Sequence, residues 1–178
     1  FPFPVQKALM YATVSTFYPD PNPETTSVDG RVGSGTVNTI WATLIAAAGG
    51  FADDTVDDGT MFFFQARAGV TDDWKEMLRS ILLFDTSALG DADTISAGVM
   101  SIFGTGKLDN GNQLPNSNVY TSTPASNTAL ANGDYAQIAS VAQATAITFA
   151  NWSTTAYNDF TLNATGLGNI SKTGVSKF

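Results

Sequence analysis

The sequence predicts an all-β protein, a single jelly-roll-like antiparallel β-sandwich with an extended N-terminal arm and long loops. Short segments rich in Val, Ile, Thr and Phe recur at roughly ten-residue spacing, and turn residues separate them. Charged residues make up 13% of the chain, about half of the usual share of about 25%. No long helical period of apolar residues is present, and a chain of 178 residues has the length of one domain.

The first part of the chain predicts an arm, a loop and a strand. Pro2 in the opening FPFP disfavours helix, so residues 1–17 are expected to form an N-terminal arm or a first strand, and residues 18–178 the sandwich domain. Residues 18–36 contain three prolines and three glycines, which predict a long loop. Residues 37–47, VNTIWATLIAA, predict a strand, and their alanines leave a helix as the alternative.

The middle of the chain predicts an acidic loop over residues 51–60 and a strand over residues 61–70. Residues 71–77 read either as one helical turn or as a second acidic loop. Residues 79–86 predict a strand that is apolar on both faces, and such a strand lies where both sides of a sheet are covered. Arg79 and Asp85 would mark its two ends, because the six steps between them span about 20 Å.

The last part of the chain continues the same pattern. Residues 93–107 predict a strand with Val99 and Phe103 opposite Met100 and Ile102, and with Gly98 at a bulge or a close backbone approach. The remaining elements are expected as follows: a loop at 108–117, strands at 118–124, 144–153 and 156–164, an irregular segment with a helical turn at 125–138, and a short helical turn within 165–174.

Composition excludes several classes of function. The net charge of −8 and the scattered basic residues argue against binding to nucleic acid or to an anionic membrane surface. The chain has no Cys and no His, which excludes disulfides, thiolate catalysis, a Ser–His–Asp triad and nearly every kind of zinc site. No apolar stretch reaches the roughly 20 residues of a membrane span.

The acidic loop offers the best candidate metal site. Asp53, Asp54, Asp57 and Asp58 could bind Ca²⁺ through carboxylate oxygens, although their spacing is not that of an EF-hand. The alternative is a solvated acidic loop without a cofactor. Asp85 is expected to end its strand by accepting N–H groups of the following turn rather than to act in catalysis.

Tryptophans offer the candidate ligand-binding residues. Trp74, in polar surroundings, and Trp152 could stack on sugars, whereas Trp41 is expected in the core; packing is the alternative for all three. Enzymatic chemistry would have to rest on carboxylates alone, and Glu24 and Glu76, the only glutamates, form no evident pair. We therefore expect a protein that is not an enzyme, with a small glycosidase as a remote alternative.

The segment RSILLFDTSALGDADTISAGVMSIFG, residues 79–104, resembles the DNRLRE-type domains of bacterial and archaeal surface proteins. The matching positions are Arg79, Leu82, Phe84, Asp85, Ser87, Leu89, Ile95, Ala97 and Ile102. Residues 158–174 look like the late strand and helical turn of the same family, so that the resemblance covers about two-thirds of the chain. It implies a jelly-roll-like sandwich of the kind found on cell walls, in carbohydrate-binding modules and on virions.

Such domains usually continue through one or two strands beyond the position of GVSKF, where this chain ends at Phe178. Either those strands are missing from the chain, or a neighbouring subunit supplies a strand at the C-terminal edge. We expect a structural or attachment protein of a virion, as a phage fibre or decoration protein, or of a cell surface. It would form homo-oligomers through its N-terminal arm and C-terminal edge. The alternative is a carbohydrate-binding module of a secreted bacterial protein, with glycans as partners.

Overall fold

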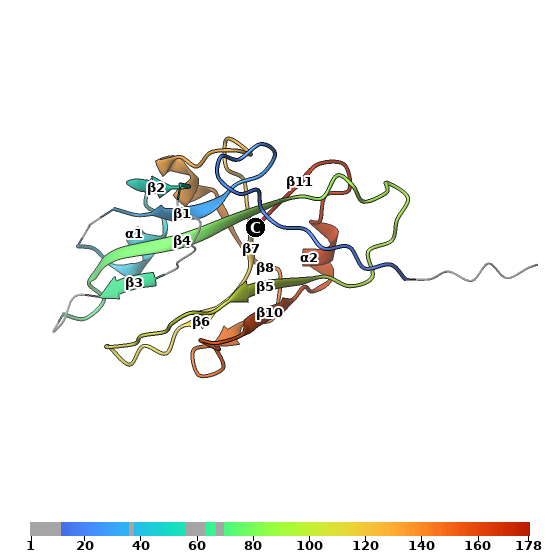
Figure 1. The fold of residues 1–178 in the computed structure, drawn as a ribbon. Coiled ribbons are helices and arrows are strands. Elements are labelled where there is room, and N and C mark those ends of the chain that lie inside the picture. Colours follow the sequence, from blue (N-terminus) through green and yellow to red (C-terminus); the bar gives the residue numbers. More distant parts are fainter. Residues whose placement is uncertain (1–11, 36–37, 56–62, 67–69) are drawn as a thin grey trace, which may run out of the picture.

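The computed structural model describes residues 12–35, 38–55, 63–66 and 70–178. The elements in chain order are β1 (Asp29–Gly33), α1 (Trp41–Ile45), β2 (Phe51–Asp53), β3 (Phe63–Ala66), β4 (Trp74–Asp85), β5 (Val99–Phe103), β6 (Asn116–Ser117), β7 (Tyr120–Ser122), the 3₁₀ helix η1 (Asn132–Gln137), β8 (Ile138–Ala142), β9 (Ile147–Thr148), β10 (Tyr157–Thr161), α2 (Ala164–Gly168) and β11 (Val175–Lys177). Strands dominate and the helices are short, so the protein is all-β (Figure 1).

The longest strand, β4, organises the main sheet. It pairs with β1 along one edge, while β3 and β11 pair with it as well, and β2 pairs with β1. Three further sheets contain two strands each, namely β10–β5, β6–β9 and β7–β8. Every strand pair in the described part of the chain is antiparallel. These sheets are small and do not close on themselves.

Both faces of β4 are covered, as its sequence predicts. Ile81 and Leu83 are fully buried in a cluster with Val28, Val32 and Tyr135, which joins β4 to β1 and η1. On the other face, Phe84 packs against a second cluster that contains Phe160 of β10 and Met100 and Ile102 of β5. In Figure 1 the β5–β10 pair accordingly lies beneath the main sheet. One alternating strand thus contributes to two cores.

The predicted bounds of this strand are wrong at its beginning. β4 starts at Trp74, so neither a helical turn nor an acidic loop extends to residue 77, and Arg79 lies in the middle of the strand rather than at its head. The cause is pairing that the local sequence does not show. Residues 74–78 pair with β3, and Trp74 also forms a bridge with Thr39.

Three other predictions near the N-terminus are wrong. The loop expected over residues 18–36 contains β1, and the acidic loop expected from residue 51 begins with β2. The glycines of β1 permit close packing instead of a turn: a Cβ at Gly30 would meet the carbonyl of Asp53 and the side chain of Leu130. The strand expected over residues 37–47 is a helix at Trp41–Ile45, the alternative that its alanines favoured.

The other expected elements are confirmed in kind, with shorter strands. The segment 93–107 contains β5, and Gly98 marks a close approach, because a Cβ there would contact Leu162, Leu167 and Ile170 at 3.1–3.3 Å. Residues 61–70, 118–124, 144–153 and 156–164 contain β3, β7, β9 and β10, residues 125–138 contain η1, and residues 165–174 contain most of α2. Neither β6 nor β8 was predicted, and the loop expected at 108–117 is wrong at its end, where β6 lies.

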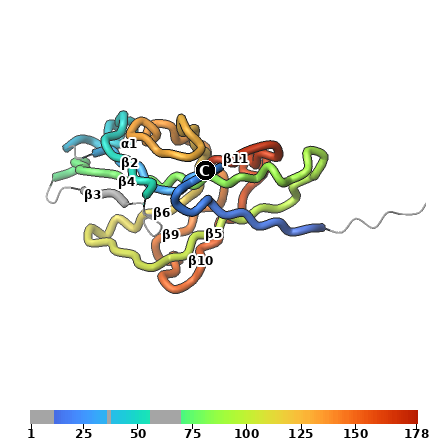
Figure 2. Tube along the Cα trace, turned by 45° about the horizontal axis from the view of Figure 1, so that its top comes forward, coloured from blue at the N-terminus to red at the C-terminus, as the bar shows by residue number. Residues whose placement is uncertain are grey.

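The N-terminal arm is described from Ala12 onward. Ala12–Tyr18 forms no helix and no strand, and Val14 and Tyr18 are 94% and 76% exposed. Figure 2 shows this blue segment running past the strands toward the edge of the molecule. The expected arm at residues 1–17 lies in part outside the described residues.

Candidate assembly surface

The arm Ala12–Tyr18 has the composition of a strand but no partner strand in the described part of the chain. Its sequence, ATVSTFY, contains β-branched and aromatic residues and no charge. In an extended chain, Val14, Thr16 and Tyr18 lie on one face. A segment of this kind gains backbone hydrogen bonds and buries apolar area only when another strand receives it.

The arm leaves the domain from a well-fixed point. One carboxylate oxygen of Asp20 accepts hydrogen bonds from the N–H and hydroxyl of Thr25 at 3.0 and 2.7 Å, and from those of Thr26 at 2.6 and 3.0 Å. The N–H of Asp20 in turn donates to the hydroxyl of Ser27, which is buried. The hydrogen bonds from Thr25 and Thr26 hold the pKa of Asp20 well below its usual range. The carboxylate therefore stays charged and, through these hydrogen bonds, holds Thr25 and Thr26 close to the base of the arm.

The second component of the surface is the open edge of β5. The N–H of Gly104 donates to the carbonyl of Ala156, and the N–H of Leu162 donates to that of Gly98, so the even-numbered residues of β5 bond to β10. By alternation, the N–H and C=O groups of Val99, Ser101 and Phe103 point to the opposite edge. No strand of the described chain pairs there.

The side chains of the same three residues lie on the outer face of the β5–β10 pair. Val99 and Phe103 are 56% and 51% exposed, and Tyr157, opposite Phe103, is 65% exposed. The Phe103 and Tyr157 rings meet edge-on, with centroids 5.2 Å apart. Between the apolar ends, the hydroxyl of Ser101 donates to Asp159 at 2.6 Å. The result is an apolar strip beside an unpaired strand edge.

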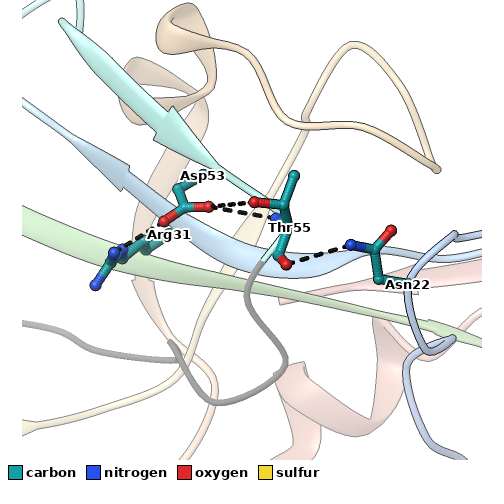
Figure 3. Close-up of polar contacts among 4 residues, drawn as sticks. All are labelled: Asn22, Arg31, Asp53 and Thr55. Carbon is teal, nitrogen blue, oxygen red and sulfur yellow. Dashed lines mark hydrogen bonds and ion pairs between the residues drawn. The ribbon is translucent and has the colours of Figure 1, made fainter.

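Two of the four predicted calcium ligands, Asp53 and Asp54, bind other parts of the chain itself. Asp53 forms an ion pair with Arg31 at 2.8 Å, and its second oxygen accepts from the N–H and hydroxyl of Thr55 (Figure 3). The Arg31 guanidinium keeps the pKa of Asp53 below its ordinary value. Asp54 accepts the N–H of Leu130 at 2.6 Å.

The other two members of the acidic cluster, Asp57 and Asp58, lie outside the described residues. Among the residues that are described, no group of three or more acidic side chains is arranged to hold a metal ion. Calcium binding therefore stays a prediction.

The candidate sugar-stacking tryptophans are both half-buried. Trp74 lies in β4, its indole N–H donates to Asp72 at 2.8 Å, and its ring is 4.7 Å from that of Trp41. Trp41 is only half-buried and does not belong to either buried cluster. Trp152 packs in the second cluster beside Phe160. The structure does not bring Trp74 and Trp152 together in one cluster.

Asp85 ends its strand as predicted. Its carboxylate accepts the N–H of Ser87 at 3.0 Å, two residues on, and hydrogen bonds from Ser87 lower its pKa. The anchoring role of Asp20 was not predicted. The signal was present in the sequence, since a Thr-Thr-Ser run follows the aspartate after a Pro-rich turn and such hydroxyls and N–H groups favour a nearby carboxylate.

Comparison of the chain with protein-family models, with curated proteins and with solved structures found no match. The resemblance to DNRLRE-type domains thus stays a prediction. Within the described part of the chain, no helix has the length and apolar character needed to cross a membrane.

Proposed function

We propose that the protein is a non-enzymatic structural or attachment protein that assembles in several copies on a virion, as a phage fibre or decoration protein, or on a cell surface. The observation that carries this proposal is the arm Ala12–Tyr18, an exposed and uncharged segment with strand-forming residues, rooted in the domain by Asp20. The arm docks on a second copy, where its backbone groups and apolar side chains gain partners.

The domain that carries the arm is a jelly-roll-like sandwich in this proposal. The main sheet forms one layer, and the β5–β10 pair is part of the other. The cluster that joins Phe84 of β4 to Phe160, Met100 and Ile102 supports this arrangement, because it fills the space between the two layers.

The way the loops are held suits a protein exposed to changing salt outside the cell. Lys107 donates to the carbonyls of Phe149, Ala150 and Trp152 at 2.9–3.1 Å, and Lys172 donates to two carbonyls of the loop after β4. Hydrogen bonds to neutral carbonyls lose less strength in salt than ion pairs between exposed side chains do.

Deletion of residues 1–16 tests the proposal. The truncated chain keeps half-buried Phe17 and the Asp20 anchor, so it should fold with an unchanged unfolding midpoint. The full chain should form oligomers in sizing with light scattering, and the truncated chain should be a monomer. A full chain that is monomeric up to about millimolar concentration, the range of weak association, would refute the proposal. So would oligomers that survive the deletion.

A second candidate function is glycan binding, which the pairing of Trp41 with Trp74 favours. Both rings are half-buried and adjacent, and the carboxylate of Asp72 lies within hydrogen-bond distance of the Trp74 indole. Aromatic faces beside a carboxylate suit the stacking and hydroxyl contacts of a sugar. A glycan array should then give hits that Trp74→Ala abolishes and Trp152→Phe retains. An array without hits excludes this function.

A further inference from the structure

The edges of the sheets differ in how well they are protected against pairing with another chain. Charged side chains and bulges are the usual protection, because both oppose the addition of a strand. Asp53 lies on β2, Lys177 on β11 and Asp159 on β10, whereas the β3–β4 and β7–β8 pairings contain register shifts. Strands β6 and β9 have two residues each.

Strand β5 has none of these features. It is five residues long, carries no charge, and pairs with β10 in an uninterrupted register. Its outward-pointing backbone groups belong to Val99, Ser101 and Phe103, and Val99 and Phe103 are more than half exposed. Among the described edges, β5 is the one that is built to accept a strand.

The arm matches this edge residue by residue. On β5, an apolar residue, a hydroxyl residue and an aromatic residue follow at every second position, as Val99, Ser101 and Phe103. On one face of the arm, Val14, Thr16 and Tyr18 repeat the same order and spacing. All of them except the two hydroxyl residues are large apolar side chains exposed by half or more.

We infer that the open edge of β5 in one copy receives the arm Ala12–Tyr18 of a second copy of this chain as an added antiparallel strand, the orientation of every strand pair in the described part of the chain. The inference rests on the proposed function and names its acceptor, which is β5 instead of the C-terminal edge expected from the sequence. Val14, Thr16 and Tyr18 lie on the outer face and extend the strip of Val99, Phe103 and Tyr157. Their N–H and C=O groups bond to β5, because directly opposite residues of a hydrogen-bonded antiparallel pair share a face and exchange both hydrogen bonds.

The antiparallel orientation fixes which residues of the two segments meet. It sets Val14 beside Phe103 and Thr16 next to Ser101. Since paired residues in adjacent strands have Cα atoms about 4.5–5.5 Å apart, cysteines at these two positions fit the Cα separation of a disulfide, about 4.4–6.8 Å. The chain has no Cys of its own, so an introduced pair reports on this contact alone.

The first experiment mixes two singly substituted full-length chains under mild oxidation. Thr16→Cys with Ser101→Cys should give a cross-linked heterodimer, identified by mass spectrometry of the joined peptides. The matched control is Thr16→Cys mixed with Lys177→Cys, which places the thiol on the edge strand β11 and should give at least about tenfold less heterodimer, the ratio of about 1.4 kcal/mol. Preferential joining to residue 177 would overturn the assignment of β5. A chain that carries both Thr16→Cys and Ser101→Cys should form the same disulfide between two copies, and a disulfide that forms only within one chain would also overturn the inference.

The second experiment uses proline, which lacks an N–H donor. Thr16→Pro removes an N–H that bonds to β5, whereas Ser15→Pro removes one that points away. We expect the dissociation constant of the assembly to rise about tenfold or more for Thr16→Pro and less than threefold for Ser15→Pro. Both positions lie in the exposed arm, so neither variant should unfold the domain. Equal effects of the two prolines, or a larger effect of Ser15→Pro, would refute this antiparallel strand addition to β5.

Failure of this inference differs from failure of the proposed function. If the full chain is monomeric, both fail together. If it assembles and the deletion of residues 1–16 abolishes assembly, while cross-links and prolines give the contrary results, only the assignment of β5 is wrong.

Discussion

The guanidinium of Arg79 is predicted to hold the main sheet, η1 and α1 together. It donates to the carbonyl of Tyr135 at 2.7 Å and to that of Ile45 at 2.9 Å, and it lies 4.1 Å from the centre of the Tyr135 ring. Burial lowers its pKa, yet an arginine stays charged in the accessible pH range. Arg79→Met keeps much of the apolar stem and removes the charge and all three contacts.

The expected loss follows from these contacts. Each hydrogen bond from a charged donor contributes about 1.5–3 kcal/mol, and a cation over a ring adds about 0.5–2 kcal/mol. Against this stands the cost of desolvating the guanidinium, which Met does not incur. Since Arg79 is half-buried, we expect the free energy of unfolding to fall by about 2–4 kcal/mol.

Urea denaturation measures this loss, with Lys107→Met as the matched control. Lys107 also donates to backbone carbonyls and lies over the ring of Phe149, but it is exposed, so we expect its removal to cost about 1 kcal/mol or less. The Arg79 effect should be nearly the same at low and high salt because its partners are uncharged carbonyls. An Arg79→Met variant that loses no more stability than Lys107→Met would refute this reasoning.

Two further predictions concern acid stability and a glycine. Hydrogen bonds from Thr25 depress the pKa of Asp20 in the folded state. The contribution of Asp20 to the free energy of unfolding is therefore complete above the ordinary carboxyl pKa of about 4 and is lost as the pH falls below it. Asp20→Asn should flatten this part of the pH profile of urea unfolding, and an unchanged profile contradicts the anchoring role. Gly49 has φ +90°, and a Cβ added there would overlap the Asn132 carbonyl, so Gly49→Ala should lower the free energy of unfolding by about 2 kcal/mol or more. Gly133 has open space around it, so Gly133→Ala should change that free energy by less than about 1 kcal/mol. Equal shifts of the thermal midpoint in the two variants would contradict this account.

The sequence was sufficient for the second half of β4, though not for its beginning at Trp74, because a continuous run of apolar residues is a local property. Ile81 and Leu83 on one side and Phe84 on the other indicated a strand covered on both faces, and they occupy the two clusters. The β5 alternation was equally readable, and Met100 and Ile102 point to the core. What the pattern could not show is that no described strand covers the far edge of β5.

The helix α1 was predicted as a strand because its stabilising contact is distant in sequence. The first helical N–H, that of Trp41, donates to the carboxylate of Asp72, 31 residues away. Without that contact, a five-residue helix has little to sustain it, and the β-branched content of residues 37–47 favours a strand. The same carboxylate binds the indole of Trp74, so the surroundings that suggested an exposed ring instead hold it in place.

Many of the charged side chains among the described residues bond to the protein's own backbone. The carboxylates of Asp20, Asp54, Asp109 and Asp134 accept backbone N–H groups, and Arg79, Lys107 and Lys172 donate to backbone carbonyls. Charges used in this way fix loops. They are then absent from the arm and from β5, the two segments where a charge would oppose strand addition. The edge strands β2, β10 and β11 each carry a charged residue, so among these edges the absence of charge is particular to β5. This absence leaves β5 and the arm able to pair with a further strand, as the proposed assembly requires.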